Sequence, residues 1–145
     1  MRTVSLGNNR MSGKFSTRRI LVIDDEEAIA DTLAAILRTR GYVIKVAYSA
    51  ESAIEIIAEW APDVASVDVM LPLMNGIDFS IVLRENHPGC RVLLFSGQPD
   101  TSTLLEEAAK QGHHFDILAK PLHPTFILDK VESLLALNQR PSHDA

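Results

Sequence analysis

The stretch ILVIDDEE, residues 20–27, sets four apolar residues, three of them β-branched, directly before four acids. A short, continuous apolar run of this kind is typical of a strand that is buried on both faces of a parallel sheet. Two like charges about 4 Å apart repel each other by about 4 kcal/mol at an effective dielectric of 20. Acids at the end of a buried strand are therefore costly, and Asp24 and Asp25 require a compensating positive charge.

Apolar runs alternate with helical patterns along the rest of the chain. Strands are predicted over residues 19–24, 42–47, 63–68, 91–95 and 114–119, and helices over residues 26–40, 50–60, 76–86, 100–111 and 123–137. Lys45 in the second strand predicts an edge position, where one side of the strand reaches water. Five alternating pairs predict an α/β protein with a five-stranded parallel sheet that is doubly wound, with helices on both faces.

Helical periodicity predicts which side chains of the helices face the core. The first helix is expected to turn four apolar residues inward: Ile29, Leu33, Ile36 and Leu37. Ser49 is the expected N-cap of the second helix. The fourth helix has the weakest apolar face of the five, which makes it the candidate for a mobile element.

Length and composition limit the kinds of protein that the chain can be. The 145 residues, with 46% hydrophobic and 23% charged side chains, suit one folded domain. No apolar run reaches the roughly 18 to 20 residues that a membrane helix needs, and the N-terminus lacks the apolar region of a signal peptide. A single cysteine, Cys90, fits a reducing compartment. We therefore expect a cytoplasmic protein that does not enter the membrane.

The charge is unevenly distributed along the chain. Residues 1–19 hold five bases and no acid, whereas residues 20–145 hold 9 bases and 19 acids. We expect a flexible basic tail over residues 1–17, a folded domain over 18–138 and a second tail over 139–145. Because affinity for DNA phosphates depends on Lys and Arg, the acidic body is not expected to bind DNA directly.

Reactive polar residues follow four of the five predicted strands. In doubly wound sheets, ligands bind beyond the carboxyl ends of the strands. Asp24 and Asp25 end the first strand, Asp68 the third, Ser96 the fourth and Lys120 the fifth. Taken one at a time, each has an ordinary structural explanation as a helix cap, a loop acid or a surface lysine. Together they predict a cluster on one rim of the sheet.

The chemistry of this predicted cluster favours phosphoryl transfer. Carboxylate oxygens suit Mg²⁺, which commonly keeps waters and phosphate oxygens as its other ligands. A lysine is a point charge for a phosphate oxygen, and Ser96 adds a hydroxyl donor. A carboxylate can itself act as the nucleophile and become an aspartyl phosphate. Asp68, the lone acid on the middle strand, is the candidate nucleophile.

With these residues in place, the chain resembles the CheY-like receiver domain of two-component response regulators over about residues 18–138. Four motifs in order carry the resemblance: VIDDEE, VDVMLPLMNG, LLFSGQ and LAKP. The most specific is VDVMLPLMNG, which has the family spacing of a phosphoacceptor aspartate, a proline and a glycine at Asp68, Pro72 and Gly76. The resemblance implies a flavodoxin-like fold with strand order 2-1-3-4-5.

The resemblance also implies a role for each residue of the rim. Asp68 would accept a phosphoryl group from a sensor histidine kinase or a histidine phosphotransfer protein. Mg²⁺ would be held by Asp24, Asp25, Asp68 and the backbone carbonyl of Met70. Lys120 would pair with the phosphoryl oxygens, Ser96 would report the phosphate, and the Lys120–Pro121 bond is expected to be cis. Such a protein is a phosphoacceptor that slowly dephosphorylates itself, not a turnover enzyme.

The sequence departs from the family pattern at several positions. Ile117 stands three residues before the lysine, where the family often has a switching aromatic ring, and Phe115 lies two residues earlier. Asn75 replaces the commoner Asp before the glycine. Met70 and Gln98 occupy positions that influence hydrolysis of the aspartyl phosphate, and we expect a lifetime at neither extreme.

The expected output is a protein contact by a stand-alone receiver, because few residues follow the fifth helix. The face formed by the fourth helix, fifth strand and fifth helix is the expected contact, for an unknown target or for a second copy in a homodimer. Two alternatives remain open: a receiver-like binding module that is never phosphorylated, and a phosphorelay shuttle or sink. Met70 stands where an aspartate phosphatase needs a second acid, and a nucleotide-binding Rossmann domain would need a glycine-rich turn.

Overall fold

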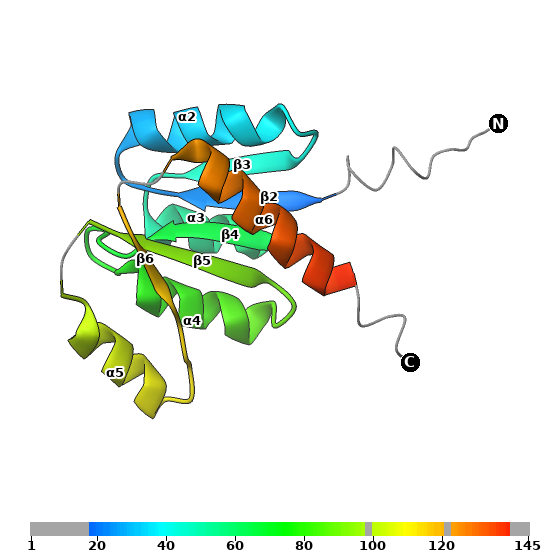
Figure 1. The fold of residues 1–145 in the computed structure, drawn as a ribbon. Helices are drawn as coiled ribbons and strands as arrows, with labels where there is room; N and C mark the ends of the chain where they lie inside the picture. The colour runs from blue at the N-terminus through cyan, green and yellow to red at the C-terminus, as the bar shows by residue number, and fades with distance from the viewer. Residues whose placement is uncertain (1–17, 98–99, 121–122, 140–145) are drawn as a thin grey trace.

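The structure, a computed structural model, describes residues 18–97, 100–120 and 123–139. Strands and helices alternate along the chain (Figure 1), in the order β2 (Arg19–Ile23), α2 (Glu27–Arg38), β3 (Val43–Ala47), α3 (Ala50–Ile57), β4 (Val64–Asp68), α4 (Gly76–Asn86), β5 (Arg91–Ser96), α5 (Ser102–Lys110), β6 (Ile117–Ala119) and α6 (Pro124–Gln139). The predicted tails lie outside the described residues, except for Gln139, which ends α6.

All five strands are parallel and lie in the order β3-β2-β4-β5-β6. Counted along the chain this is the order 2-1-3-4-5, so the predicted fold is confirmed, and β3 with Lys45 is an edge strand. Helices α2 and α6 cover one face of the sheet, and α3, α4 and α5 lie on the other (Figure 1). The carboxyl ends of β2 and β4 are adjacent at the middle of the sheet.

Alternate residues of each central strand pack into two separate hydrophobic cores, one on each face of the sheet. On one face, strand residues such as Val22, Val64 and Phe95 pack with buried residues of α2 and α6. On the other face, residues such as Ile23, Val67 and Leu94 pack with α3, α4 and α5. Because the side-chain period of a strand is two, burial on both faces explains the unbroken apolar run that begins at Ile20.

The buried face of α2 differs from the one predicted. Ile29 is 45% exposed, whereas Ala30 and Ala34 are fully buried together with Leu37. The prediction that Ile29 faces the core is therefore wrong. Alanine has a small side chain, so a helix that turns two alanines inward can approach the sheet closely, and the bulkier Ile29 is left at the margin.

The last strand is shorter than predicted. It begins at Ile117 rather than at residue 114. The preceding segment is held by Arg84 of α4, whose guanidinium lies 4.1 Å from the centroid of the Phe115 ring and donates a hydrogen bond to the His114 carbonyl at 3.3 Å. Residues 114 and 115 thus contact α4, and pairing with β5 begins only at Ile117.

Two predictions about the helices are confirmed. The Ser49 hydroxyl accepts a hydrogen bond from the Ser52 backbone N–H at 3.1 Å, as an N-cap should. Ala108 is the only buried residue of α5, so this helix is held by few apolar contacts. The thin apolar face read from the sequence is therefore real.

Candidate functional site

Three carboxylates meet at the carboxyl end of the sheet. Asp24 and Asp25 directly follow β2, and Asp68 is the last residue of β4. One oxygen from each lies within 4.8 Å of the others. Asp24 and Asp68 are only 6% and 7% exposed, and Asp25 is exposed. The convergence predicted from the strand ends is therefore present in the fold.

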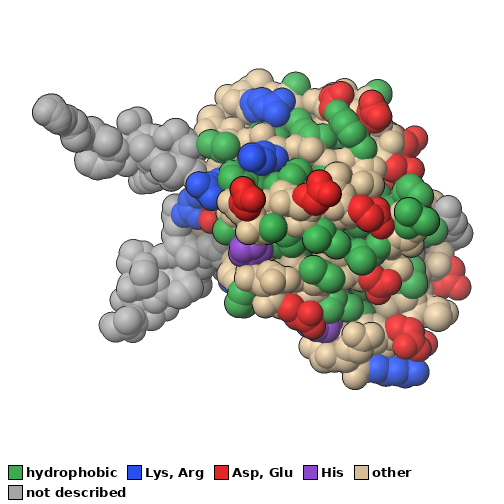
Figure 2. All heavy atoms as spheres, turned by 180° about the vertical axis from the view of Figure 1, so that it is seen from behind, with side chains coloured by type: hydrophobic (Ala, Val, Ile, Leu, Met, Phe, Trp, Pro, Cys, Tyr) green, Lys and Arg blue, Asp and Glu red, His purple; other side chains and the backbone are tan. Residues whose placement is uncertain are grey.

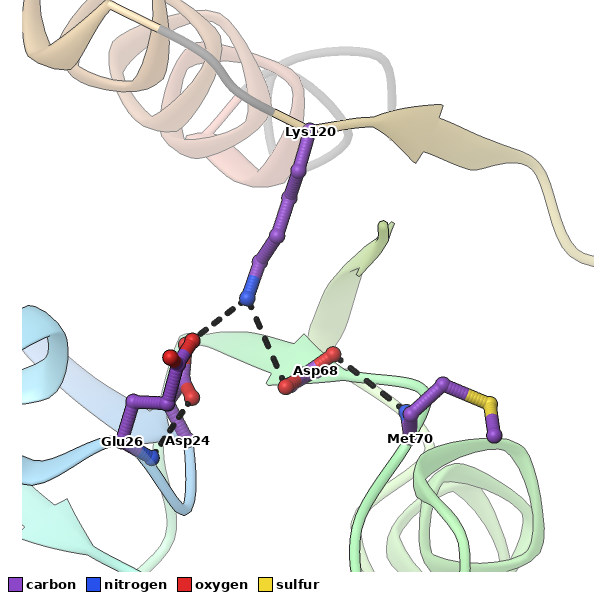
Figure 3. A network of polar contacts seen from close by, with 5 residues as sticks. All are labelled: Asp24, Glu26, Asp68, Met70 and Lys120. Atoms are coloured by element: carbon purple, nitrogen blue, oxygen red, sulfur yellow. Dashed lines mark hydrogen bonds and ion pairs between the residues drawn. The ribbon is translucent and has the colours of Figure 1, made fainter. Parts of the chain in front are cut away.

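Lys120 provides the positive charge that this cluster needs. It follows β6 and extends between the two buried acids (Figure 3). Its Nζ lies 3.1 Å from Asp24 Oδ2 and 3.4 Å from Asp68 Oδ2. The charge partner sought for Asp24 at the end of the first strand thus comes from a residue 96 positions later in the chain.

Backbone N–H groups fix the remaining oxygens of the two buried acids (Figure 3). The Glu26 N–H donates to Asp24 Oδ1 at 3.0 Å, and the Met70 N–H donates to Asp68 Oδ1 at 3.3 Å. The N-cap position of α2 is Glu26, whose side chain forms no cap hydrogen bond, so neither Asp24 nor Asp25 caps the helix. The ordinary explanation of these two acids as helix caps is therefore excluded.

The surroundings change the proton affinity of Asp68 and Lys120. Burial raises the pKa of Asp68 from 3.8 to about 6, and the nearby charge of Asp24 adds to the rise, whereas Lys120 and the Met70 N–H oppose it. Burial works against the cation of Lys120, but its bonds to Asp24 and Asp68 outweigh burial and raise its pKa. At neutral pH the site therefore holds an ionised Asp68 beside a cationic lysine.

Removing the Lys120 cation is expected to raise the pKa of Asp68 further. In Lys120→Met the apolar side chain keeps much of the volume, but the charge that opposes protonation of Asp68 is lost. Titration of the Asp68 side-chain ¹³C signal by NMR should show a midpoint above about 6. Lys110→Met, which removes an exposed lysine on α5, should leave the midpoint unchanged. Equal midpoints in the two variants would contradict the assignment of Lys120 as the counter-charge.

The segment that follows Asp68 is tied closely to the sheet and to α4. The Val69 N–H donates to the Phe95 carbonyl, and the Gly76 N–H donates to the Val69 carbonyl, both at 2.8 Å. A Cβ on Gly76 would overlap the Asp68 carbonyl oxygen and lie 2.8 Å from Val67 Cγ1. Gly76 is therefore required by the close approach of α4 to the end of β4, which the family spacing alone did not explain.

Two further features of this segment were not predicted. The Asn75 side chain accepts a hydrogen bond from the Asp78 N–H at 2.9 Å and so caps α4, although the sequence marked it only as a departure from the family pattern. Leu73 has a φ of 66° and is 93% exposed, and Met70 is 45% exposed. Apolar side chains thus face solvent beside Asp68.

Ser96 lies at the same end of the sheet. It is the last residue of β5 and is 2% exposed, and its carbonyl accepts a hydrogen bond from the Lys120 backbone N–H at 2.9 Å. With Leu105 and Ile117 it lines a cavity of about 240 Å³ next to α5. Its role as a reporter of phosphate stays a prediction. The expected cis bond at Pro121 and the position of Gln98 lie outside the described residues.

Comparison with known proteins agrees with this geometry. The family model of the response regulator receiver domain matches residues 20–132. The chain belongs to this family. This receiver is 33% identical over 125 residues to the DNA-binding response regulator MtrA of Mycolicibacterium smegmatis, an alignment that covers 84% of the chain and 52% of MtrA. The receiver chain thus spans about half the length of the curated relatives that it matches.

Solved structures show the same fold. The CheY-like receiver domain protein from Methanospirillum hungatei JF-1 has a TM-score of 0.77 and 25% identity, over 86% of this chain and 98% of that one. A response regulator protein from Burkholderia pseudomallei, whose structure holds a phosphorylated aspartic acid, a calcium ion and citrate, has a TM-score of 0.67 and 29% identity, over 84% and 75% of the two chains.

Membership of the family carries its general chemistry. Receiver domains are phosphorylated on an aspartate by histidine kinases, bind Mg²⁺ at a cluster of acids and are phosphoacceptors rather than enzymes in the usual sense. In the described part of this receiver the acids Asp24, Asp25 and Asp68 form such a cluster. Among the described helices, none combines the length and apolar character that crossing a membrane requires.

Proposed function

We propose that this receiver accepts a phosphoryl group on Asp68 from a phosphohistidine of a sensor kinase or a phosphotransfer protein. One observation carries the proposal: the nearly buried Asp68 carboxylate lies 3.4 Å from the Lys120 ammonium and within 4.8 Å of oxygens of Asp24 and Asp25. A nucleophile, a cation and two further acids at one point are the parts that phosphoryl transfer uses.

Each group would act as its chemistry dictates. An ionised Asp68 oxygen attacks phosphorus, the bond from phosphorus to the imidazole nitrogen of the donor breaks, and the electron pair of that bond stays on the nitrogen. With its pKa at about 6, Asp68 is mostly ionised at pH 7 and ready to attack. Lys120 would then pair with a phosphoryl oxygen, a change of partner within reach of its present bond to Asp68.

The donor set also fits Mg²⁺. Hard carboxylate oxygens suit this ion, which binds through few protein ligands and keeps positions for water and phosphate. Asp24, Asp25 and Asp68 would hold it, with the Met70 carbonyl as a further ligand. When bound, the ion neutralises the acids and the oxygens of the incoming phosphoryl group. Asp24 and Asp68 share one lysine between them, so this site has more negative than positive charge.

Residues around the site support contacts with two kinds of protein, the phosphodonor and the downstream target. The exposed Met70 and Leu73 beside Asp68 offer apolar contacts for a phosphodonor. We infer that the output is a contact made by α5, β6 and α6, with a target protein or a second copy, in a cytoplasmic receiver. The sparse burial of α5 supports this face as the mobile one.

The charge of the body supports output through proteins rather than DNA. Residues 20–145 hold 9 bases and 19 acids, and acids are spread over the face in Figure 2. MtrA is named as DNA-binding, but the match covers only 52% of it, so a comparison of DNA affinity between phosphorylated and unphosphorylated protein is the direct check.

Incubation with acetyl phosphate and Mg²⁺ is expected to add one phosphoryl group to the chain. Intact-mass spectrometry should show the adduct, and its yield should fall sharply when EDTA removes the ion, because the uncompensated acids then repel the phosphate. Acid-stable, base-labile behaviour of the adduct would identify it as an acyl phosphate. An unmodified mass in the presence of Mg²⁺ would favour the alternative of a binding module that is never phosphorylated.

A further inference from the structure

A second hollow lies next to the acid cluster, between α2, α6 and the sheet. Its volume is about 270 Å³, and most of its lining is apolar. The lining residues come from β2, α2, β4, β5 and α6, and include Val22, Ala30, Leu33, Phe95 and Ile127. Asp24, Asp68 and Lys120 form one margin of the same cavity. Of the described residues in the lining, the remaining polar one is Ser66.

Ser66 lies deep in this cavity. It is in the middle of β4, 3% exposed, and shares a strand face with Asp68 two residues later. Among the residues that the structure describes, its hydroxyl has no hydrogen-bond partner, and buried polar side chains are usually satisfied by protein or by a bound molecule. A hydroxyl without a partner among the described residues, in a mainly apolar cavity, is a hydrogen-bonding group to which a bound molecule could attach.

The size and margin of the cavity limit what can enter. An apolar cavity of about 150 Å³ admits benzene, so this one has room for a single ring with short substituents. The exposed Ile29 and the partly exposed Lys120 mark its open side, and the buried Ala30 and Ser66 its inner side. Ala30 of α2 lines the cavity with a single methyl group, so a larger side chain at that position would occupy part of its volume.

Charge decides the class of ligand. Among the described residues the cation at the margin is Lys120, which is already bonded to Asp24 and Asp68, so an anion entering here would meet two carboxylates. A cation would have to lose its hydration against Val22, Leu33 and Phe95. We propose that the cavity binds a small, neutral, mainly apolar organic molecule with one hydroxyl or carbonyl group, which hydrogen-bonds to Ser66. The proposal goes beyond phosphoryl transfer and does not depend on it.

The probe for this site is p-cresol, a neutral ring with one hydroxyl and one methyl group, and p-xylene is its partner without the hydroxyl. Methyl NMR spectra of the full chain should show saturable shifts at Val22, Leu33 and Ile127 with both molecules. Ser66→Ala should weaken p-cresol binding by roughly three- to tenfold, the effect expected of one net hydrogen bond, and leave p-xylene binding nearly unchanged. Equal losses for the two molecules, or no loss, would overturn the role of Ser66.

Two helix variants test the location. Ala30→Leu fills the cavity and should abolish the shifts, whereas Ala35→Leu places the same side chain on the exposed side of α2 and should not. Absence of saturable shifts in the unsubstituted chain would show that the cavity does not bind the probe, and shifts that survive Ala30→Leu would show that the probe binds elsewhere. Either result would overturn the proposal. Binding of p-cresol is measured without Mg²⁺ or a phosphodonor, so failure of the phosphoryl-transfer proposal is distinguishable from failure of this one.

Discussion

Asp68→Asn is expected to show no phosphoryl adduct after incubation with acetyl phosphate and Mg²⁺. The amide keeps the shape of the carboxylate but has no anionic oxygen to attack phosphorus. We expect no adduct on Asp24 or Asp25, the other two acids of the cluster. Intact mass measures the yield. Peptide mapping of the phosphorylated protein without substitutions should place the adduct on Asp68.

The matched control is Asp129→Asn, which removes an exposed aspartate on α6 and should be phosphorylated to the same extent as the protein without substitutions. Asp68→Asn should also remain folded. The raised pKa of Asp68 means that the folded chain holds a proton between pH 3.8 and about 6 that the unfolded chain releases. The carboxylate therefore costs stability as pH rises through this window, and the cost is complete above about pH 6.

Removing this carboxylate should accordingly stabilise the metal-free protein by about 1–3 kcal/mol at pH 7.5, with a smaller gain at pH 4.5. Urea denaturation at the two pH values measures the difference. A variant that is folded, at least as stable as its parent and unmodified by acetyl phosphate would tie the chemistry to Asp68. A full adduct on Asp68→Asn would contradict the assignment whatever its stability.

The position of the acid cluster can be predicted from the sequence, because the sequence shows both where the strands end and which residues there are charged. Once β2, β4 and β6 are identified as parallel strands, Asp24, Asp68 and Lys120 must lie at one end of the sheet. The edge position of β3 follows from Lys45. The sequence does not show which face of α2 is buried, because both isoleucines and alanines recur at helical spacing. Packing against the sheet decides that Ala30 rather than Ile29 turns inward.

Long-range contacts account for the other differences. Nothing near Phe115 in the sequence indicates that Arg84 of α4 will lie over its ring, or that the last strand will begin only at Ile117. Ser66 reads as one small polar residue in a buried strand, and the cavity beside it depends on which side chains of α2 and α6 face it. The sequence marks Gly76 through spacing, but the reason for glycine is a backbone oxygen eight residues earlier.

Gly76→Ala is expected to lower the free energy of unfolding by about 3 kcal/mol, the upper part of the range for an overpacked core position. The added Cβ would overlap the Asp68 carbonyl oxygen and lie 2.8 Å from Val67 Cγ1. Both atoms belong to β4, a fully buried strand that cannot shift without disturbing its neighbours in the sheet. Gly76 has no positive φ, so the cost comes from this overlap rather than from backbone conformation. Urea denaturation measures it.

Gly89→Ala is the matched control, because a Cβ at that position meets no atom within 4 Å. It should leave stability within about 0.5 kcal/mol of the parent, as surface substitutions usually do. Where Gly76→Ala remains folded, it should also be phosphorylated more slowly than Gly89→Ala, because relief of the overlap moves the backbone that carries Asp68. Equal stability and equal phosphorylation rates in the two variants would show that the contact between α4 and β4 does not hold the phosphoacceptor in place.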